Sequence, residues 1–153
     1  MLIEKLDSDL KTAIKDKNIP RLSVIRLLKT AITNKMIELN VNKLEDIDII
    51  ELIRKDIKRH QDSIEQFKKG ERYDLVTKEE AELKVLKSYL PKEVSPEEIR
   101  VLVKKVIDET KANGKKDFGK VMKTTMEKLK GAADSKTVSS IINELLCGSQ
   151  NQV

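Results

Sequence analysis

The stretch DIDIIELIRKDIKRHQDSIEQFKKG, residues 46–70, decides the fold of this chain. Its apolar stripe advances in alternating steps of three and four residues, through Ile50, Ile53, Ile57, His60, Ile64 and Phe67. This period matches one face of an α-helix, whereas side chains of a strand alternate at every second residue. We therefore predict a long amphipathic helix over 46–69, which Gly70 ends.

The same helical period continues on both sides of this stretch. Before it, two helices are joined by the short turn KNIP, which predicts an antiparallel pair. Behind it, Asn113–Gly114 and Gly131 separate the last three helices. The predicted helices are 2–17, 21–39, 46–69, a fourth that ends before Pro91, 96–112, 117–130 and 135–146.

The composition favours an all-α fold. The 153 residues are 39% hydrophobic and 37% charged, but only 3% are aromatic, so the core must be aliphatic. Few glycines and prolines interrupt the helical pattern. A chain of this length buries about 70% of its unfolded surface, which is enough for a stable core without a metal or a disulfide.

Two prolines mark a boundary between two predicted domains. The segment PKEVSPEE, residues 91–98, contains Pro91 and Pro96, and Ser95 with Glu98 forms a capping box for the following helix. We predict an N-terminal domain of about four helices, a compact C-terminal three-helix domain and a flexible tail. Their ranges are 1–91, 92–148 and 149–153.

The cysteine and the hydropathy pattern predict a cytoplasmic protein. Cys147 has no second cysteine with which to form a disulfide or a cysteine-based metal site. No run of about 18 apolar residues is present, and Glu4 and Lys5 interrupt the first residues, so we expect neither a membrane helix nor a signal peptide. A membrane partner is not expected.

Residues for catalysis or ligand binding are sparse. His60 is the single histidine, and its place on an apolar stripe favours a buried packing role over a catalytic or metal-binding one. The acidic pairs in KEEAEL and SPEEIR lie near helix starts, where dipole and capping interactions account for them. The glycines match no phosphate-binding loop. We predict no catalytic residue, no metal and no cofactor.

Two clusters of basic side chains carry the strongest functional signal. The C-terminal lysine set comprises Lys115, Lys116, Lys120, Lys123, Lys128, Lys130 and Lys136. The second basic patch comprises Arg54, Lys55, Lys58, Arg59, Lys68, Lys69 and Arg72. Binding of RNA phosphates and an ordinary solvated surface both explain these clusters. Only Tyr73 is a candidate for base stacking, so recognition of RNA backbone or shape is favoured over reading of single-stranded sequence.

Four blocks of the sequence resemble one known family in their order and spacing. They are RLSVIRLLKTAITNKMIE (21–38), IRKDIKRHQDSIEQFKKGERYDL (53–75), ELKVLKSYLPKEVSPEEI (82–99) and DFGKVMKTTMEKLKGAADSKTVSSIINELL (117–146). Together they resemble the YqeY-like proteins, whose C-terminal part is similar to the tail domain of GatB, the B subunit of tRNA-dependent amidotransferases. The resemblance implies a two-domain all-α protein.

The resemblance also implies a function. In the amidotransferase the tail domain helps to hold tRNA, while other domains and subunits carry out catalysis. We therefore expect a non-catalytic module associated with tRNA, another structured RNA or tRNA-dependent amidation. One alternative is an adaptor that binds an amidotransferase-like or other protein through a helix face. Another is a carbon–nitrogen ligase with glutamine as amido donor, which the family label suggests but the lack of a recognisable nucleophile argues against.

The turn GAAD, residues 131–134, departs from the family pattern. The family commonly has GRAD or GKAD there, so Ala132 replaces a basic side chain. Gly131 and Asp134 remain, and we predict structural roles for both. Gly131 would end one helix in a left-handed conformation, and Asp134 would cap the next helix.

Overall fold

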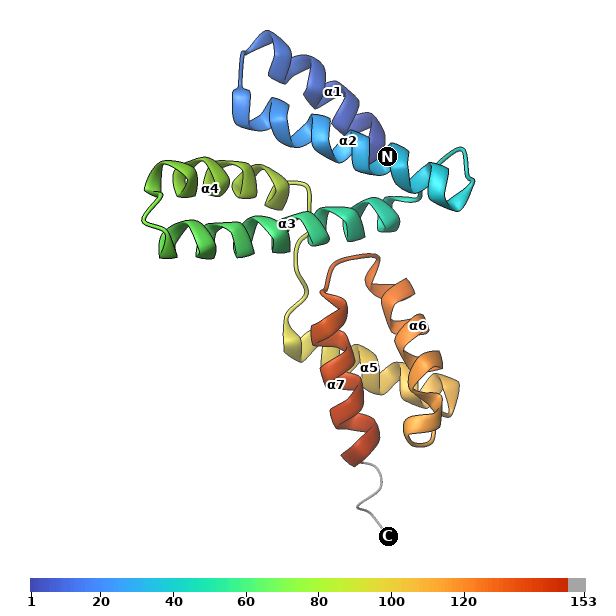
Figure 1. Cartoon of the computed structure of the whole chain (residues 1–153). Helices are drawn as coiled ribbons and strands as arrows, with labels where there is room; N and C mark the ends of the chain where they lie inside the picture. The colour runs from blue at the N-terminus through green and yellow to red at the C-terminus, as the bar shows by residue number, and fades with distance from the viewer. Residues whose placement is uncertain (149–153) are drawn as a thin grey trace. The chain divides into compact units, whose positions relative to one another are not determined.

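The computed structural model describes residues 1–148, which form seven α-helices and one short 3-10 helix and contain no strand. The prediction of an all-α fold is confirmed. The helices are α1 (Leu2–Lys15), α2 (Ile19–Leu39), α3 (Asp46–Lys69), α4 (Tyr73–Lys87), α5 (Pro96–Thr110), η1 (Lys115–Asp117), α6 (Phe118–Leu129) and α7 (Ser135–Gly148) (Figure 1). The predicted flexible tail, 149–153, lies outside the described residues.

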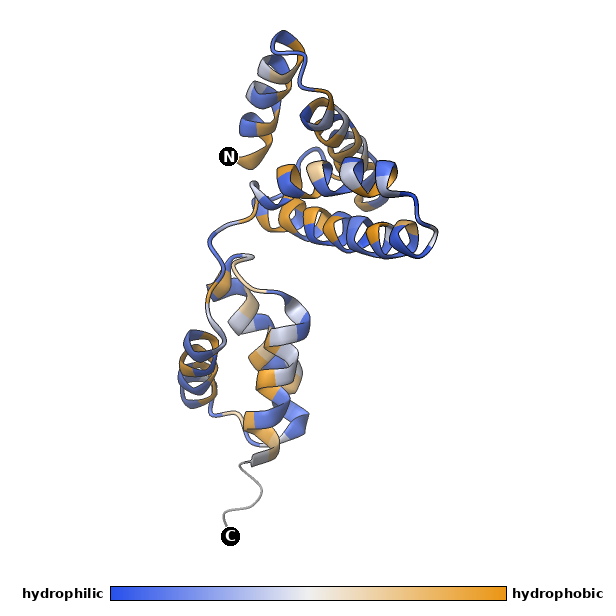
Figure 2. Cartoon of the chain, turned by 90° about the vertical axis from the view of Figure 1, so that its left-hand side faces the viewer, coloured by the Kyte–Doolittle hydropathy of each residue, from blue (hydrophilic) through white to orange (hydrophobic). Residues whose placement is uncertain are grey.

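The chain divides into two compact units, and each has its own aliphatic core. The N-terminal unit, Met1–Leu90, carries α1–α4, and the C-terminal unit begins at Pro91 and carries α5–α7. In both units most helices are apolar on one side and polar on the other (Figure 2). Fully buried side chains of the first core include Leu6, Ile25, Leu28, Ile53 and Leu86; those of the second include Ile99, Val103, Val121, Ile142 and Leu146.

The N-terminal unit is built from two helical hairpins. The α1–α2 pair and the α3–α4 pair each have a short connection, and α2 packs against α4 (Figure 1). The opening sequence stretch forms α3 over the predicted residues, and its stripe buries Ile53, Ile57 and His60. Two large apolar side chains of this unit, Ile14 and Leu39, are exposed. Both lie in the last turn of a helix, where packing neighbours lie on only one side along the axis.

A polar cluster joins α1 and α2 to the residues that follow α4. The Tyr89 hydroxyl donates a 2.7 Å hydrogen bond to the Asp9 carboxylate, which also lies 2.9 Å from the Arg21 guanidinium. The ammonium group of Lys5 lies 5.4 Å from the centre of the Tyr89 ring. Burial, together with the bond to Asp9, raises the pKa of Tyr89 to about 12. The tyrosine is therefore neutral and donates to Asp9 at physiological pH.

In the C-terminal unit, the GAAD turn is packed and hydrogen-bonded. Lys130 and Gly131 both have positive φ angles, 47° and 81°, so the left-handed end of α6 starts one residue before Gly131. The Ala132 carbonyl accepts a 2.9 Å bond from the Val94 N–H, and Ala133 is buried in the core. The carbonyl of Asp134 accepts a 3.1 Å bond from the Val138 N–H in the first turn of α7.

Removal of the Ser95 hydroxyl is expected to destabilise the C-terminal unit. Ser95 Oγ accepts from the Glu98 N–H at 3.3 Å, and the Glu98 carboxylate accepts from the Ser95 N–H at 3.0 Å. Loss of such a cap costs about 1 kcal/mol. Thermal unfolding of Ser95→Ala should show this loss, whereas Ser140→Ala, at an exposed position within α7, should change stability little. Equal stability of the two variants would contradict a capping role.

Candidate functional site

All seven members of the C-terminal lysine set are exposed to solvent. Lys115 and Lys116 lie in η1, at the start of α6, and Lys130 lies at the end of α6. The helix spans 12 residues, which corresponds to a length of about 18 Å. Lys136 lies in the first turn of α7. The set therefore extends along the whole of α6 and is not concentrated at one point.

Local partners occupy two of these lysines. The ammonium group of Lys128 lies 2.5 Å from the Glu109 carboxylate on α5, and this hydrogen bond holds the pKa of Glu109 below its usual value. The ammonium group of Lys120 lies 3.4 Å from the Thr110 carbonyl. The other five lysines of the set have no ion pair within residues 1–148. These are Lys115, Lys116, Lys123, Lys130 and Lys136.

The polar face of α6 carries one acidic residue as well as lysines. Val121 and Leu129 are buried, whereas Lys120 and Lys123 are exposed, as their spacing predicts. Glu127 follows Lys123 by four residues and is also exposed, so it shares this face. Its carboxylate lowers the local positive charge and makes the two ends of the helix the most basic parts of the set.

The second basic patch consists of two groups that are well separated along α3. Lys68 and Lys69 follow Lys55, Lys58 and Arg59 by 9 to 14 residues. The longest of these separations corresponds to about 21 Å of helix. Acidic neighbours pair with several of them: Arg59 with Asp56 at 3.6 Å, Lys68 with Glu80 at 3.7 Å and Arg72 with Asp74 at 3.1 Å. Arg54 is half-buried. Acidic neighbours therefore lower the positive charge of this patch below the value that its sequence alone suggests.

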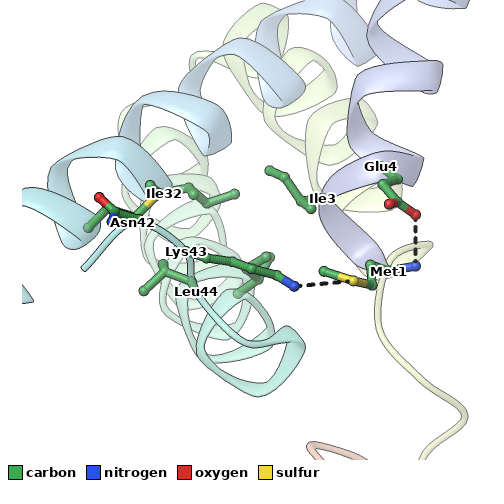
Figure 3. Close-up of a pocket in the computed structure, with 9 residues that line it drawn as sticks. Met1, Ile3, Glu4, Ile32, Asn42, Lys43 and Leu44 are labelled. Atoms are coloured by element: carbon green, nitrogen blue, oxygen red, sulfur yellow. Dashed lines mark hydrogen bonds and ion pairs between the residues drawn. The ribbon is translucent and has the colours of Figure 1, made fainter.

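A cavity of about 400 Å³ opens in the N-terminal unit, between the start of α1, the end of α2 and the start of α3. Its lining comprises Met1, Ile3, Glu4, Ile32, Met36, Asn42, Lys43, Leu44 and Ile49 (Figure 3). The Lys43 ammonium lies 3.4 Å from Met1 Sδ, and the Met1 amine lies 3.4 Å from Glu4. No histidine or cysteine is among these lining residues.

His60 lies in a polar site between α3 and α4. The side chain is buried, as its place on the apolar stripe predicts, and its Nδ1 atom lies 2.6 Å from the Glu79 carboxylate. The Glu82 carboxylate lies 3.9 Å from the same nitrogen, and the Asp56 carboxylate lies 3.9 Å from Nε2. Three acidic side chains therefore surround one imidazole.

The acidic residues of KEEAEL lie within α4 and not near its start, and the sequence contains a signal for one of them, Glu82. Glu82 lies four residues before the core residue Leu86, so it shares the side of α4 on which that residue is buried. Charged side chains are rarely buried unless they are paired. Its position on that side of the helix therefore marks Glu82 as a residue with a specific partner, which the structure identifies as His60.

The fold and these surfaces define a small all-α protein in which a three-helix unit carries exposed lysines. The sequence model of the family described as "Yqey-like protein" matches residues 3–146, and the chain belongs to this family. The resemblance that the four sequence blocks indicated is thereby confirmed.

Three curated relatives that match over most of the chain are each named "Altered inheritance of mitochondria protein 41, mitochondrial". The protein of Pyrenophora tritici-repentis is 37% identical over 150 residues, which cover 95% of this chain and 81% of the relative. The protein of Vanderwaltozyma polyspora is 33% identical over 91% of this chain and 79% of its own length. The protein of Saccharomyces cerevisiae strain YJM789 is 36% identical over 74% and 64%, respectively.

These names contradict the prediction of a cytoplasmic location, because the relatives are named as mitochondrial proteins. A lone cysteine and the lack of a long apolar run do not distinguish one aqueous compartment from another, so the composition was insufficient for that inference. Among residues 1–148, none of the helices combines the length and the apolar composition needed to cross a bilayer.

Proposed function

We propose that this YqeY-like protein is a non-catalytic RNA-associated module that binds the phosphate backbone of tRNA or another structured RNA through the C-terminal lysine set. One observation carries the proposal: five exposed lysines have no acidic partner within residues 1–148. Such ammonium groups are free to replace the counterions of a nucleic acid, which favours binding through release of those ions.

The distribution of aromatic side chains supports recognition of backbone over base. Phe118, the aromatic residue of α6, packs against the C-terminal core and is not free to stack on a base. Tyr73 is exposed, but it belongs to α4 in the N-terminal unit. Sequence-specific binding of single-stranded RNA depends on such stacking, whereas folded RNA is recognised largely through its phosphates and shape.

A more specific form of the proposal is that the bound RNA is tRNA. The similarity of the C-terminal part of YqeY-like proteins to a tRNA-holding tail domain favours tRNA over other folded RNAs, and an accessory role in tRNA-dependent amidation follows from the same analogy. Because the relatives are named as mitochondrial proteins, mitochondrial tRNA is a suitable probe together with total tRNA.

Neutralising three unpaired lysines is expected to weaken tRNA binding and to reduce its dependence on salt. Each phosphate contact contributes up to about 0.9 to the slope of log affinity against log salt concentration. Lys115→Gln, Lys116→Gln and Lys123→Gln together should therefore flatten the slope by up to about 2.7. Binding is to be measured by fluorescence anisotropy with labelled tRNA over a salt series.

A matched control removes the same charge from the N-terminal unit. Lys11, Lys15 and Lys84 are exposed and belong to neither basic cluster, so their replacement by glutamine should leave the slope nearly unchanged. If both triple variants flatten the salt slope equally, the effect depends only on the net charge of the protein. That result would contradict binding through a defined surface. Absence of tRNA binding by the parent chain at low salt would contradict the RNA proposal itself.

A second candidate function is a protein-interaction adaptor, which exposed apolar side chains of α2 favour. Ile37 is 72% exposed, and Ile19 and Leu27 are also exposed on this helix. The expected partner is an amidotransferase-like protein with an apolar helix face. Recovery of one stoichiometric protein of this kind at moderate salt, by a chain that binds no tRNA at low salt, would favour the adaptor over the RNA-associated module.

A further inference from the structure

The side chains around His60 have the composition and spacing of a metal site. Nδ1 of His60 and one carboxylate oxygen each of Glu79 and Glu82 lie within 4.8 Å of one another. α3 contributes the histidine, and α4 contributes the two carboxylates at positions i and i+3, which lie on one face of a helix. The antiparallel packing of α3 and α4 thus brings together a nitrogen ligand and two oxygen ligands.

Glu82 is a buried carboxylate with one long contact, to its partner His60. The residue is only 4% exposed, and its distance of 3.9 Å from His60 Nδ1 exceeds that of a hydrogen bond. The cationic group that the structure places beside this carboxylate is the imidazole of His60, if it is protonated. A buried carboxylate is stabilised when a cation approaches it closely, so this position is suited to a positive ligand.

The other side of the imidazole ring resembles the surroundings of a metal-binding histidine. A histidine that binds a metal through one nitrogen usually donates a hydrogen bond from the other to a carboxylate or carbonyl, which orients the ring. In this chain the Asp56 carboxylate lies 3.9 Å from Nε2, one helical turn earlier on α3. A small movement of either side chain closes that hydrogen bond and leaves Nδ1 to face the ion.

We propose that His60, Glu79 and Glu82 bind a divalent transition-metal ion, with Zn²⁺ as the expected occupant. A ligand set of one imidazole and two carboxylates suits zinc, whereas magnesium and calcium prefer sites made of oxygen ligands alone. Two carboxylates neutralise the charge of the ion. Ligand atoms of a tetrahedral zinc site are about 3.4 Å apart. His60 and Glu79 must therefore separate from 2.6 Å, the carboxylates must converge, and water completes the fourth position.

Zinc titration of the full chain tests the proposal. The measurement uses Cys147→Ser, because the exposed thiol would otherwise compete for zinc, and a chromophoric chelator reports the free ion. We expect one Zn²⁺ per chain at micromolar free concentration. In the same background, Glu82→Gln and Glu79→Gln should each weaken binding at least tenfold. Zinc should also raise the midpoint of thermal unfolding of the parent but not of Glu82→Gln.

Glu80→Gln is the matched control, because it removes a carboxylate from the same helix outside the cluster. Glu80 is exposed and pairs with Lys68 at 3.7 Å. Its loss should leave zinc affinity unchanged. The proposal is overturned if the parent binds no zinc at micromolar concentration, or if Glu80→Gln weakens binding as much as Glu82→Gln. Glu82→Gln preserves side-chain shape and removes a buried charge, so it should fold about as stably as the metal-free parent.

Discussion

Replacement of Ile142 by alanine is expected to leave the C-terminal unit largely unfolded at physiological temperature. Ile142 of α7 is fully buried in the core, together with Ile99 and Val103 of α5 and Val121 of α6. Truncation of a buried isoleucine to alanine costs about 2–5 kcal/mol. A single core in a domain of this size rarely contributes more than about 3–5 kcal/mol, so the expected loss removes most of the stability of this unit.

Amide hydrogen exchange can locate the effect within the chain. The N-terminal core is built from different residues, so protection should be lost in α5–α7 and retained in α1–α4. Ile142→Val removes one methylene group and should cost about 1 kcal/mol. Val101→Ala changes an exposed residue of α5 and should have little effect on stability. Native protection of α5–α7 in Ile142→Ala would contradict the assignment of this residue to a marginal core.

The fold was predictable from sequence because local signals agree with the packing. The alternation of apolar steps across 46–69 predicts α3 with the bounds that the structure shows. Ser95, Pro96 and Glu98 likewise predict the start of α5 from capping chemistry alone. Predictions were less accurate where a helix ends without such a signal. α1 ends at Lys15, two residues before the predicted end, whereas α4 ends at Lys87, before Pro91 as predicted.

The candidate sites were less predictable because they depend on which helices pack together. Lys128 and Glu109 are 19 residues apart in sequence, and only the packing of α5 and α6 joins their charges. His60 and Glu79 are also 19 residues apart, and the register of the α3–α4 hairpin sets their distance. Helical periodicity places a residue on a face, but it does not identify the residue opposite. Charge counts therefore overestimated the number of free lysines.

Replacement of Thr125 by valine is expected to stabilise the C-terminal unit. Thr125 of α6 is fully buried, and its hydroxyl has no hydrogen-bond partner among residues 1–148. A buried hydroxyl without a partner costs about 1–3 kcal/mol, and valine replaces it with a methyl group of similar size and the same branching at Cβ. A domain of 60–100 residues gains about 4–8 °C in unfolding midpoint for each kcal/mol. Calorimetry of the full chain should resolve this increase.

Thr124→Val is the control that separates the hydroxyl from the helix position. The two residues are adjacent on α6, but Thr124 Oγ1 donates a 3.0 Å hydrogen bond to the Lys120 carbonyl. The same chemical change should therefore be neutral or slightly destabilising at position 124. Destabilisation by Thr125→Val would instead show that the buried hydroxyl has a partner such as a bound water, because only the loss of a hydrogen bond makes this substitution unfavourable in an apolar core.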